Sequence, residues 1–139
     1  MIGFVQRLRR AELRGERGAV AVEFALVVPL LLVFLFSIVS VSRAFQVQGT
    51  LSAAAREAAR TMAIQNDASA AKNAAVFAAS VSSIPLSAGN ISLSPSTCTG
   101  ASPTTNVTVT ITYSFQPMGD FAGGLAFPIT SQAVLRCGG

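Results

Sequence analysis

Histidine and tryptophan are absent from the 139 residues, cysteine occurs only twice, and only 12% of the side chains are charged. The lack of histidine removes the usual general base and the commonest metal ligand. Cys98 and Cys137 alone make a poor zinc site, because structural zinc takes four ligands. No spacing of nucleophile and base connects the serines with Glu57 or Asp120. The sequence therefore predicts neither an enzyme nor a bound metal or cofactor.

Positive charge is scarce after the first 18 residues. These residues hold five arginines and two glutamates, a net charge of +3, and the remaining chain carries a net charge of +1. A basic tail beside an apolar segment favours retention on the cytoplasmic side, close to anionic lipid. No basic stripe with interleaved aromatic residues appears later in the chain, so nucleic acid is not an expected partner.

A long apolar run extends from Ala19 to Ser42, and Glu23 is its only ionisable side chain. About 20 helical residues cross a hydrocarbon core of roughly 30 Å, so this run is long enough to span a membrane. Pro29 has no N–H and is expected to loosen or kink the helix near its start. The arginines before the run outnumber Arg43 after it. This predicts a single-pass protein of the cytoplasmic membrane with its N-terminus inside.

A secretory signal peptide is the competing interpretation of the apolar run. The sequence S-V-S at 40–42 resembles a small-x-small cleavage site. However, the apolar centre of a signal peptide usually covers about 7 to 15 residues, which is shorter than this run. A retained helix is therefore favoured. The alternative function is a small membrane-anchored or secreted binding domain that uses a sheet face for its ligand.

Residues 44–65 are predicted to continue as an amphipathic helix. Apolar residues recur at intervals of three and four and share one face; they are Val47, Leu51, Ala54, Ala58 and Met62. The opposite side carries Arg56, Glu57 and Arg60. The narrow, alanine-rich face either covers the protein's own domain or admits a partner at close range.

Turn and strand signals follow this helix. Asn66-Asp67 marks a break, and Asp67 is a predicted N-cap for a second helix that ends near Ser80. A short strand is expected at residues 90–94, and strict alternation predicts a half-buried strand at 106–115. A loop from Pro117 to Gly124 leads to a last strand, predicted at 129–137 and antiparallel to the one before it.

These elements together predict an α+β fold. A long N-terminal membrane helix continues into an amphipathic helix, which packs on a small antiparallel sheet in two layers. If this part of the chain lies in an oxidising compartment, a disulfide between Cys98 and Cys137 is favoured over two unrelated buried thiols.

Two stretches of sequence resemble a known family. R-G-A-V-A-V-E-F-A-L-V-V-P-L-L-L resembles the N-terminus of TadE-like pseudopilins of the Tad (Flp) pilus system. The final I-T-S-Q-A-V-L-R-C-G-G also resembles the ending of TadE-like proteins from actinobacteria. Residues 14–63 carry most of this resemblance, and the middle of the chain is generic. Phe24 lacks the hydroxyl of the Glu-Tyr pair of Flp pilins but matches the Glu-Phe pair of the TadE branch.

The resemblance implies a pilin-like fold and a processed structural protein. It implies cleavage by a prepilin peptidase between Gly18 and Ala19, with Glu23 and Phe24 as the assembly and processing motif. The chain is then divided into a leader at 1–18, a transmembrane helix at 19–42 and an extracytoplasmic α+β domain at 43–139. Expected partners are the peptidase, the membrane, other pilins or pseudopilins and pilus assembly proteins. The expected role is that of a minor pilin in adhesion or secretion.

Overall fold

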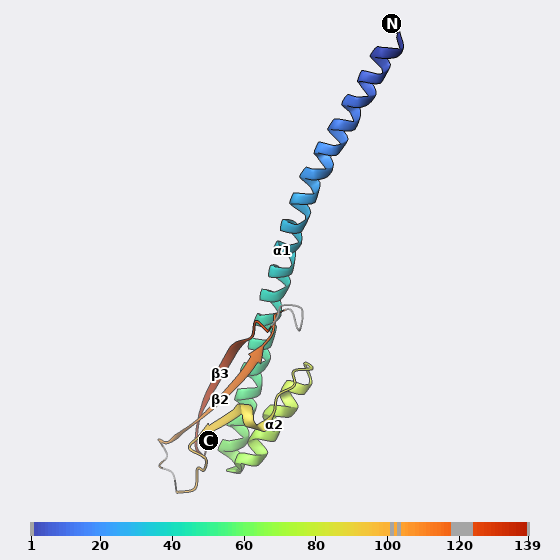
Figure 1. The fold of residues 1–139 in the computed structure, drawn as a ribbon. Helices are drawn as coiled ribbons and strands as arrows, with labels where there is room; N and C mark the ends of the chain where they lie inside the picture. The colour runs from blue at the N-terminus through green and yellow to red at the C-terminus, as the bar shows by residue number, and fades with distance from the viewer. Residues whose placement is uncertain (1, 101, 103, 118–123, 139) are drawn as a thin grey trace. The chain divides into compact units, whose positions relative to one another are not determined.

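The computed structural model describes residues 2–100, 102, 104–117 and 124–138, with side chains described from Gly18 onward. The chain divides into two compact units, Met1–Val39 and Ser40–Gly139. Helix α1 (Ile2–Gln65) contributes to both units (Figure 1). Most of the predicted loop between the last two strands, residues 118–123, lies outside the described residues.

The N-terminal unit consists of the first part of α1. Valine and leucine are the commonest residues from Gly18 to Val39, and the helix continues through Pro29. The kink predicted there remains a prediction. From Gly18 onward α1 is long and apolar enough to cross a membrane, with a mean hydropathy of 2.9 over its most apolar window. None of that window is buried inside the protein.

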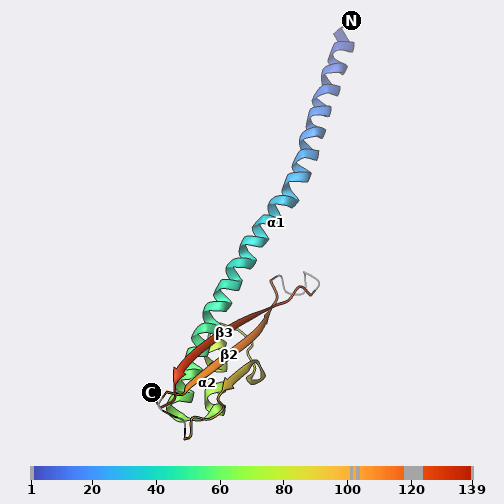
Figure 2. The ribbon, with the colours of Figure 1, turned by 90° about the vertical axis from the view of Figure 1, so that its left-hand side faces the viewer.

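The C-terminal unit has two layers, which Figures 1 and 2 show from two sides. One layer holds α1 from Ser40 onward together with helix α2 (Ala68–Ser80). The other is a three-stranded antiparallel sheet in the order β1-β2-β3, preceded by a short 3-10 helix. The bounds are Ala88–Asn90 for the 3-10 helix η1, Ile91–Ser94 for β1, Asn106–Phe115 for β2 and Phe127–Arg136 for β3. The predicted α+β architecture is confirmed.

The core lies between the helices and one face of the sheet. Strand β2 buries Val107, Val109 and Ile111 completely, and threonines occupy the alternate positions. The register sets Val109 opposite Ala133 and Ile111 opposite Ser131, so β3 contributes to the same inner face. Ser131 is the buried polar residue on this face, and its hydroxyl lies 3.0 Å from that of Ser52 on α1. The hydroxyl pair removes the cost of an unsatisfied polar group in the core.

The boundary between α1 and α2 follows from two side chains. Asn66 has a positive φ of 50°, and its N–H donates to the carbonyl of Met62, which ends α1 in a left-handed cap. Asp67 then accepts hydrogen bonds from the N–H groups of Ser69 and Ala70 at 2.7 and 3.2 Å. The N-cap predicted at Asp67 is confirmed.

The last strand differs from its prediction. It begins at Phe127 rather than Ile129 and ends at Arg136, one residue before Cys137. The added residues include Pro128, which cannot donate to a strand ladder. However, β3 is an edge strand in the order β1-β2-β3, where a proline is tolerated. Phe127 pairs with Phe115, with the two ring centroids 5.3 Å apart.

Candidate functional site

The predicted cleavage position lies within α1. Gly18 and Ala19 are both exposed, and a Cβ added at Gly18 would meet no atom within 4 Å. Glycine inside a helix is less favourable than alanine by about 0.8 to 1 kcal/mol. Packing within the described part of the chain therefore gives no reason for a glycine at position 18.

Glu23 and Phe24 lie on the exposed surface of the same helix. Glu23 follows Ala19 by four residues, which is about 6 Å along a helix axis at 1.5 Å per residue. Glu23 is the only ionisable residue from Ala19 to Ser42. A carboxylate in an apolar surface is costly unless it reaches water or meets a cation.

The apolar helix leaves its large side chains uncovered. Their exposed fractions run from 47% at Leu32 to 73% at Leu26. The exposed residues of this segment include Val20, Val22, Phe24, Leu26, Val27, Leu30, Leu31, Leu32, Val33, Phe34, Leu35, Phe36, Ile38, Val39 and Val41. A soluble protein rarely exposes so large an apolar surface. By its length, apolarity and exposure the helix is suited to be a single-pass membrane anchor.

In the C-terminal unit, one face of α1 packs against the protein's own domain. Leu51, Ala54, Ala58 and Met62 are completely buried there, and the predicted stripe is widened by Ala55 and Ala59. Arg56, Glu57 and Arg60 are exposed on the other side, as expected. Of the two alternatives for the alanine-rich face, the structure shows the first: residues of the protein's own β2, β3 and α2 cover it.

Cys98 and Cys137 form a disulfide, with Cα atoms 5.5 Å apart and a separation of 39 positions in sequence. Cys98 lies in the connection from β1 to β2, and Cys137 directly follows β3. Asn66 holds the same connection to the end of α1: its Oδ1 accepts from the Cys98 N–H at 2.6 Å. Its Nδ2 donates to the Thr99 hydroxyl at 2.5 Å. This second role of Asn66 was not predicted, since nothing local links residue 66 to residue 98.

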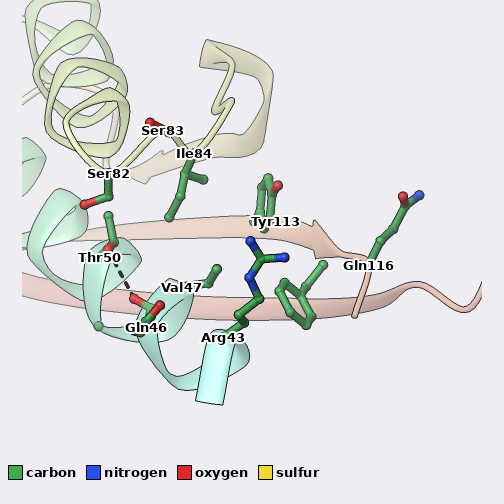
Figure 3. Close-up of a pocket in the computed structure, with 11 residues that line it drawn as sticks. Arg43, Gln46, Val47, Thr50, Ser82, Ser83, Ile84, Tyr113 and Gln116 are labelled. Carbon is green, nitrogen blue, oxygen red and sulfur yellow. Dashed lines mark hydrogen bonds between the residues drawn. The ribbon is translucent and has the colours of Figure 1, made fainter. Parts of the chain in front are cut away.

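A pocket of about 720 Å³ opens on the C-terminal unit (Figure 3). Its lining residues come from the first turns of this unit's part of α1, the turn after α2 and the end of β2; they are Arg43, Gln46, Val47, Gly49, Thr50, Ser82, Ser83, Ile84, Tyr113, Phe115 and Gln116. Figure 3 shows the Arg43 side chain extending toward Tyr113. Sequence reasoning missed the pocket, because its walls come from three separate segments of the chain, at residues 43–50, 82–84 and 113–116.

The predicted site residues thus fall into two groups. Gly18, Ala19, Glu23, Phe24 and Pro29 all lie on the apolar part of α1, in the N-terminal unit. Cys98 and Cys137 lie together in the C-terminal unit. Among the residues from 18 onward whose side chains the structure describes, no cluster of histidine, cysteine, aspartate and glutamate has a geometry suited to a metal ion.

Comparison with known proteins adds one match. A family model described as TadE-like protein matches residues 18–60, which are 43 of the 139 residues. No curated protein and no solved structure matches the chain. The match begins at Gly18 and includes Glu23, Phe24, Pro29 and the whole apolar run. Residues 18–60 are therefore similar to TadE-like proteins, in agreement with the resemblance of the N-terminal segment.

Proposed function

We propose that the protein is a minor pilin or pseudopilin that joins, primes or caps a Tad-type pilus or a related secretion assembly. In this role the chain catalyses no reaction. It is the substrate of a prepilin peptidase and then a structural subunit. The observation that carries the proposal is a single carboxylate, Glu23, five residues after Gly18 on an otherwise apolar and exposed helix in a TadE-like segment.

Gly18 supports the proposed cleavage. The residue has open space around it, so its small size serves no internal contact among the described residues. A peptidase that must bring its catalytic groups close to the backbone benefits from the missing side chain. Cleavage after Gly18 removes the basic leader and leaves a positive amine on Ala19.

Glu23 supports the proposed assembly. The new amine of one subunit and the Glu23 carboxylate of its neighbour are opposite charges in a low-dielectric environment, where removing one member of a pair costs about 3 to 5 kcal/mol. The pair therefore favours one axial register of neighbouring helices over others. An alternative role for Glu23 is simple contact with water at the membrane surface, which its place near the start of the apolar run permits.

The proposal includes an orientation. The five arginines of the leader keep the N-terminus on the cytoplasmic side. The domain that follows Arg43 then lies outside the cytoplasm, where a disulfide persists. Other pilins or pseudopilins contact the apolar helix, and pilus assembly proteins receive the processed subunit.

The mass and N-terminal sequence of the membrane-associated protein test the proposal. Loss of residues 1–18 is expected, with Ala19 as the new first residue. Cleavage after Ser42 would refute the proposal and support a secreted binding domain instead.

Gly18→Ala is expected to leave the leader attached, so that the full-length chain accumulates in the membrane. Gly49→Ala is the matched control, because Gly49 also lies inside α1 with open space around it. Equal processing of both variants would rule out Gly18 as the recognised residue.

A further inference from the structure

The pocket of the C-terminal unit has an apolar floor and a polar rim. Ile84 and Phe115 line it and are only 8% and 7% exposed, and Val47 packs against the same core. These three residues form the floor, whereas Arg43 and Gln116 line the pocket and are exposed. A volume of about 720 Å³ lies within the range of about 300 to 1,000 Å³ that is usual for small-molecule sites.

One wall of the pocket is a turn with a fixed backbone. The N–H of Ser82 donates to the carbonyl of Ala79 at 3.1 Å, and that of Ser83 donates to the carbonyl of Ser80 at 2.9 Å. The N–H of Ile84 also donates to the carbonyl of Ala79, at 3.2 Å. The turn therefore presents the hydroxyl groups of Ser82 and Ser83 to the pocket from a hydrogen-bonded backbone.

The charge of the pocket comes from Arg43. None of the described residues that line the pocket is acidic, so its guanidinium group is available to an anion. The turn at 82–84 follows the C-terminal end of α2, where a helix dipole is negative, and the last turn of α2 holds no basic residue. A doubly charged phosphate would be opposed by this dipole. A carboxylate carries one charge, and its two oxygens match two parallel N–H groups of a guanidinium.

Neutral hydrogen-bonding groups complete the lining. The side-chain amides of Gln46 and Gln116 can each donate and accept, and so can the hydroxyl of Tyr113. Figure 3 shows Arg43 reaching toward Tyr113 from the opposite wall. A ligand rich in hydroxyl groups matches such a lining, because each hydroxyl also donates and accepts. The apolar floor suits the C–H face of a sugar ring.

We propose that the pocket binds a sugar acid, a carboxylate-bearing unit of a polysaccharide. Arg43 pairs with the carboxylate, the amide and hydroxyl groups of the rim bind the ring hydroxyls, and the floor packs against the C–H face of the ring. All lining residues belong to the unit Ser40–Gly139. The inference goes beyond the proposed role in pilus assembly, and it does not depend on cleavage or on the orientation of the chain.

Tyr113 provides a reporter inside the pocket. It is the only tyrosine of the chain, and tryptophan is absent. The full chain is kept in a polyoxyethylene alkyl ether detergent, which carries neither sugar nor charge, and is titrated at pH 7 with trigalacturonic acid. Maltotriose is the neutral trisaccharide control, and inorganic phosphate is the control anion. The fluorescence of Tyr113 and isothermal titration calorimetry measure the binding.

We expect trigalacturonic acid to bind at least about fivefold more tightly than maltotriose or phosphate, because only the acid engages both the guanidinium and the neutral groups. Equal binding of maltotriose would overturn the role of the charge. Tighter binding of phosphate would overturn the sugar as the ligand. Absence of saturable binding of the acid would refute the proposal as a whole. None of these outcomes affects the mass measurement that tests the proposed processing.

Variants locate the binding in the pocket. Arg43→Gln should weaken binding of the acid at least about fivefold, and Arg60→Gln, on an exposed position of the same helix outside the pocket, should not change it. Ser82→Ala should weaken binding about twofold, whereas Ser69→Ala in the first turn of α2 should have no effect. Unchanged affinity of the Arg43 variant would overturn the proposed site. Equal unfolding midpoints of the four variants show that the fold is retained.

Discussion

In the proposed assembly, the chemistry of Glu23 decides how neighbouring subunits meet. It stands on an exposed, apolar helix, and its carboxylate has a defined distance in sequence from the predicted new N-terminus. A carboxylate that merely reaches water would tolerate replacement by a neutral residue. One that pairs with the amine of a neighbour would not.

Glu23→Ala is therefore expected to be cleaved normally and to be incorporated poorly. Since loss of one member of a buried charge pair costs about 3 to 5 kcal/mol, recovery with other pilus components should fall at least about tenfold. Mass spectrometry measures the cleavage and co-purification measures the incorporation. Glu57→Ala, on the exposed face of α1 beside the sheet domain, is the control. Undiminished co-purification of the Glu23 variant would favour the simple contact with water.

Asn66 combines a backbone role with a side-chain role. Its positive φ suits asparagine or glycine, and its amide binds the segment that carries Cys98. Both Asn66→Gly and Asn66→Ala remove the side-chain bonds. Alanine, unlike glycine, is also strained in the left-handed backbone conformation of position 66. The alanine variant should therefore have a free energy of unfolding about 1 kcal/mol lower than the glycine variant. Denaturation of the full chain in detergent, followed by fluorescence of Tyr113, checks this. Equal stability of the two variants would contradict the role of φ.

Helix α1 changes character along its length. Its apolar part exposes large side chains, whereas its last turns bury alanines at close range against α2 and the sheet. The alanines of α2 that face this contact, Ala71, Ala75 and Ala79, are also completely buried. Small side chains on both helices leave no room for larger ones, because cores are close-packed.

Ala58→Leu is predicted to destabilise the domain by about 1 to 3 kcal/mol through overpacking. Ala53→Leu provides the matched control on the exposed side of the same helix, where the change should stay within about 0.5 kcal/mol. Denaturant titration of both variants gives the two free energies. A comparable loss at both positions would show that helix propensity, and not packing, sets the effect.

At the scale of the whole molecule, the disulfide joins the β1–β2 connection to the end of β3. Replacing both Cys98 and Cys137 with serine releases a segment of 39 residues and should lower the stability by about 3 to 4 kcal/mol. The loss is expected in the unfolding of the sheet domain, reported by Tyr113. The helicity of the apolar segment in detergent should not change. An unaltered unfolding midpoint would mean that packing and the Asn66 contacts alone hold this connection.

Much of this architecture was readable from the sequence, for reasons that differ between elements. Strand β2 was predicted with its observed bounds, since alternation of valine and threonine is a local pattern. The core face of α1 was also predicted, but its alanine-rich composition left open whether the protein's own domain or a partner covered it. The start of β3 was missed at Pro128, because its place at the sheet edge depends on tertiary structure. The pocket around Arg43 was not predictable, because three separate elements form its walls.

The buried face of α1 has a mechanical consequence. Its completely buried residues extend from Leu51 to Met62, about 16 Å of helix, and are not gathered at one end. Tension applied along this helix loads all of these contacts in shear, so they must fail together and not one after another. A subunit anchored through the apolar part of α1 would therefore transmit a pull to its folded domain without losing its core stepwise.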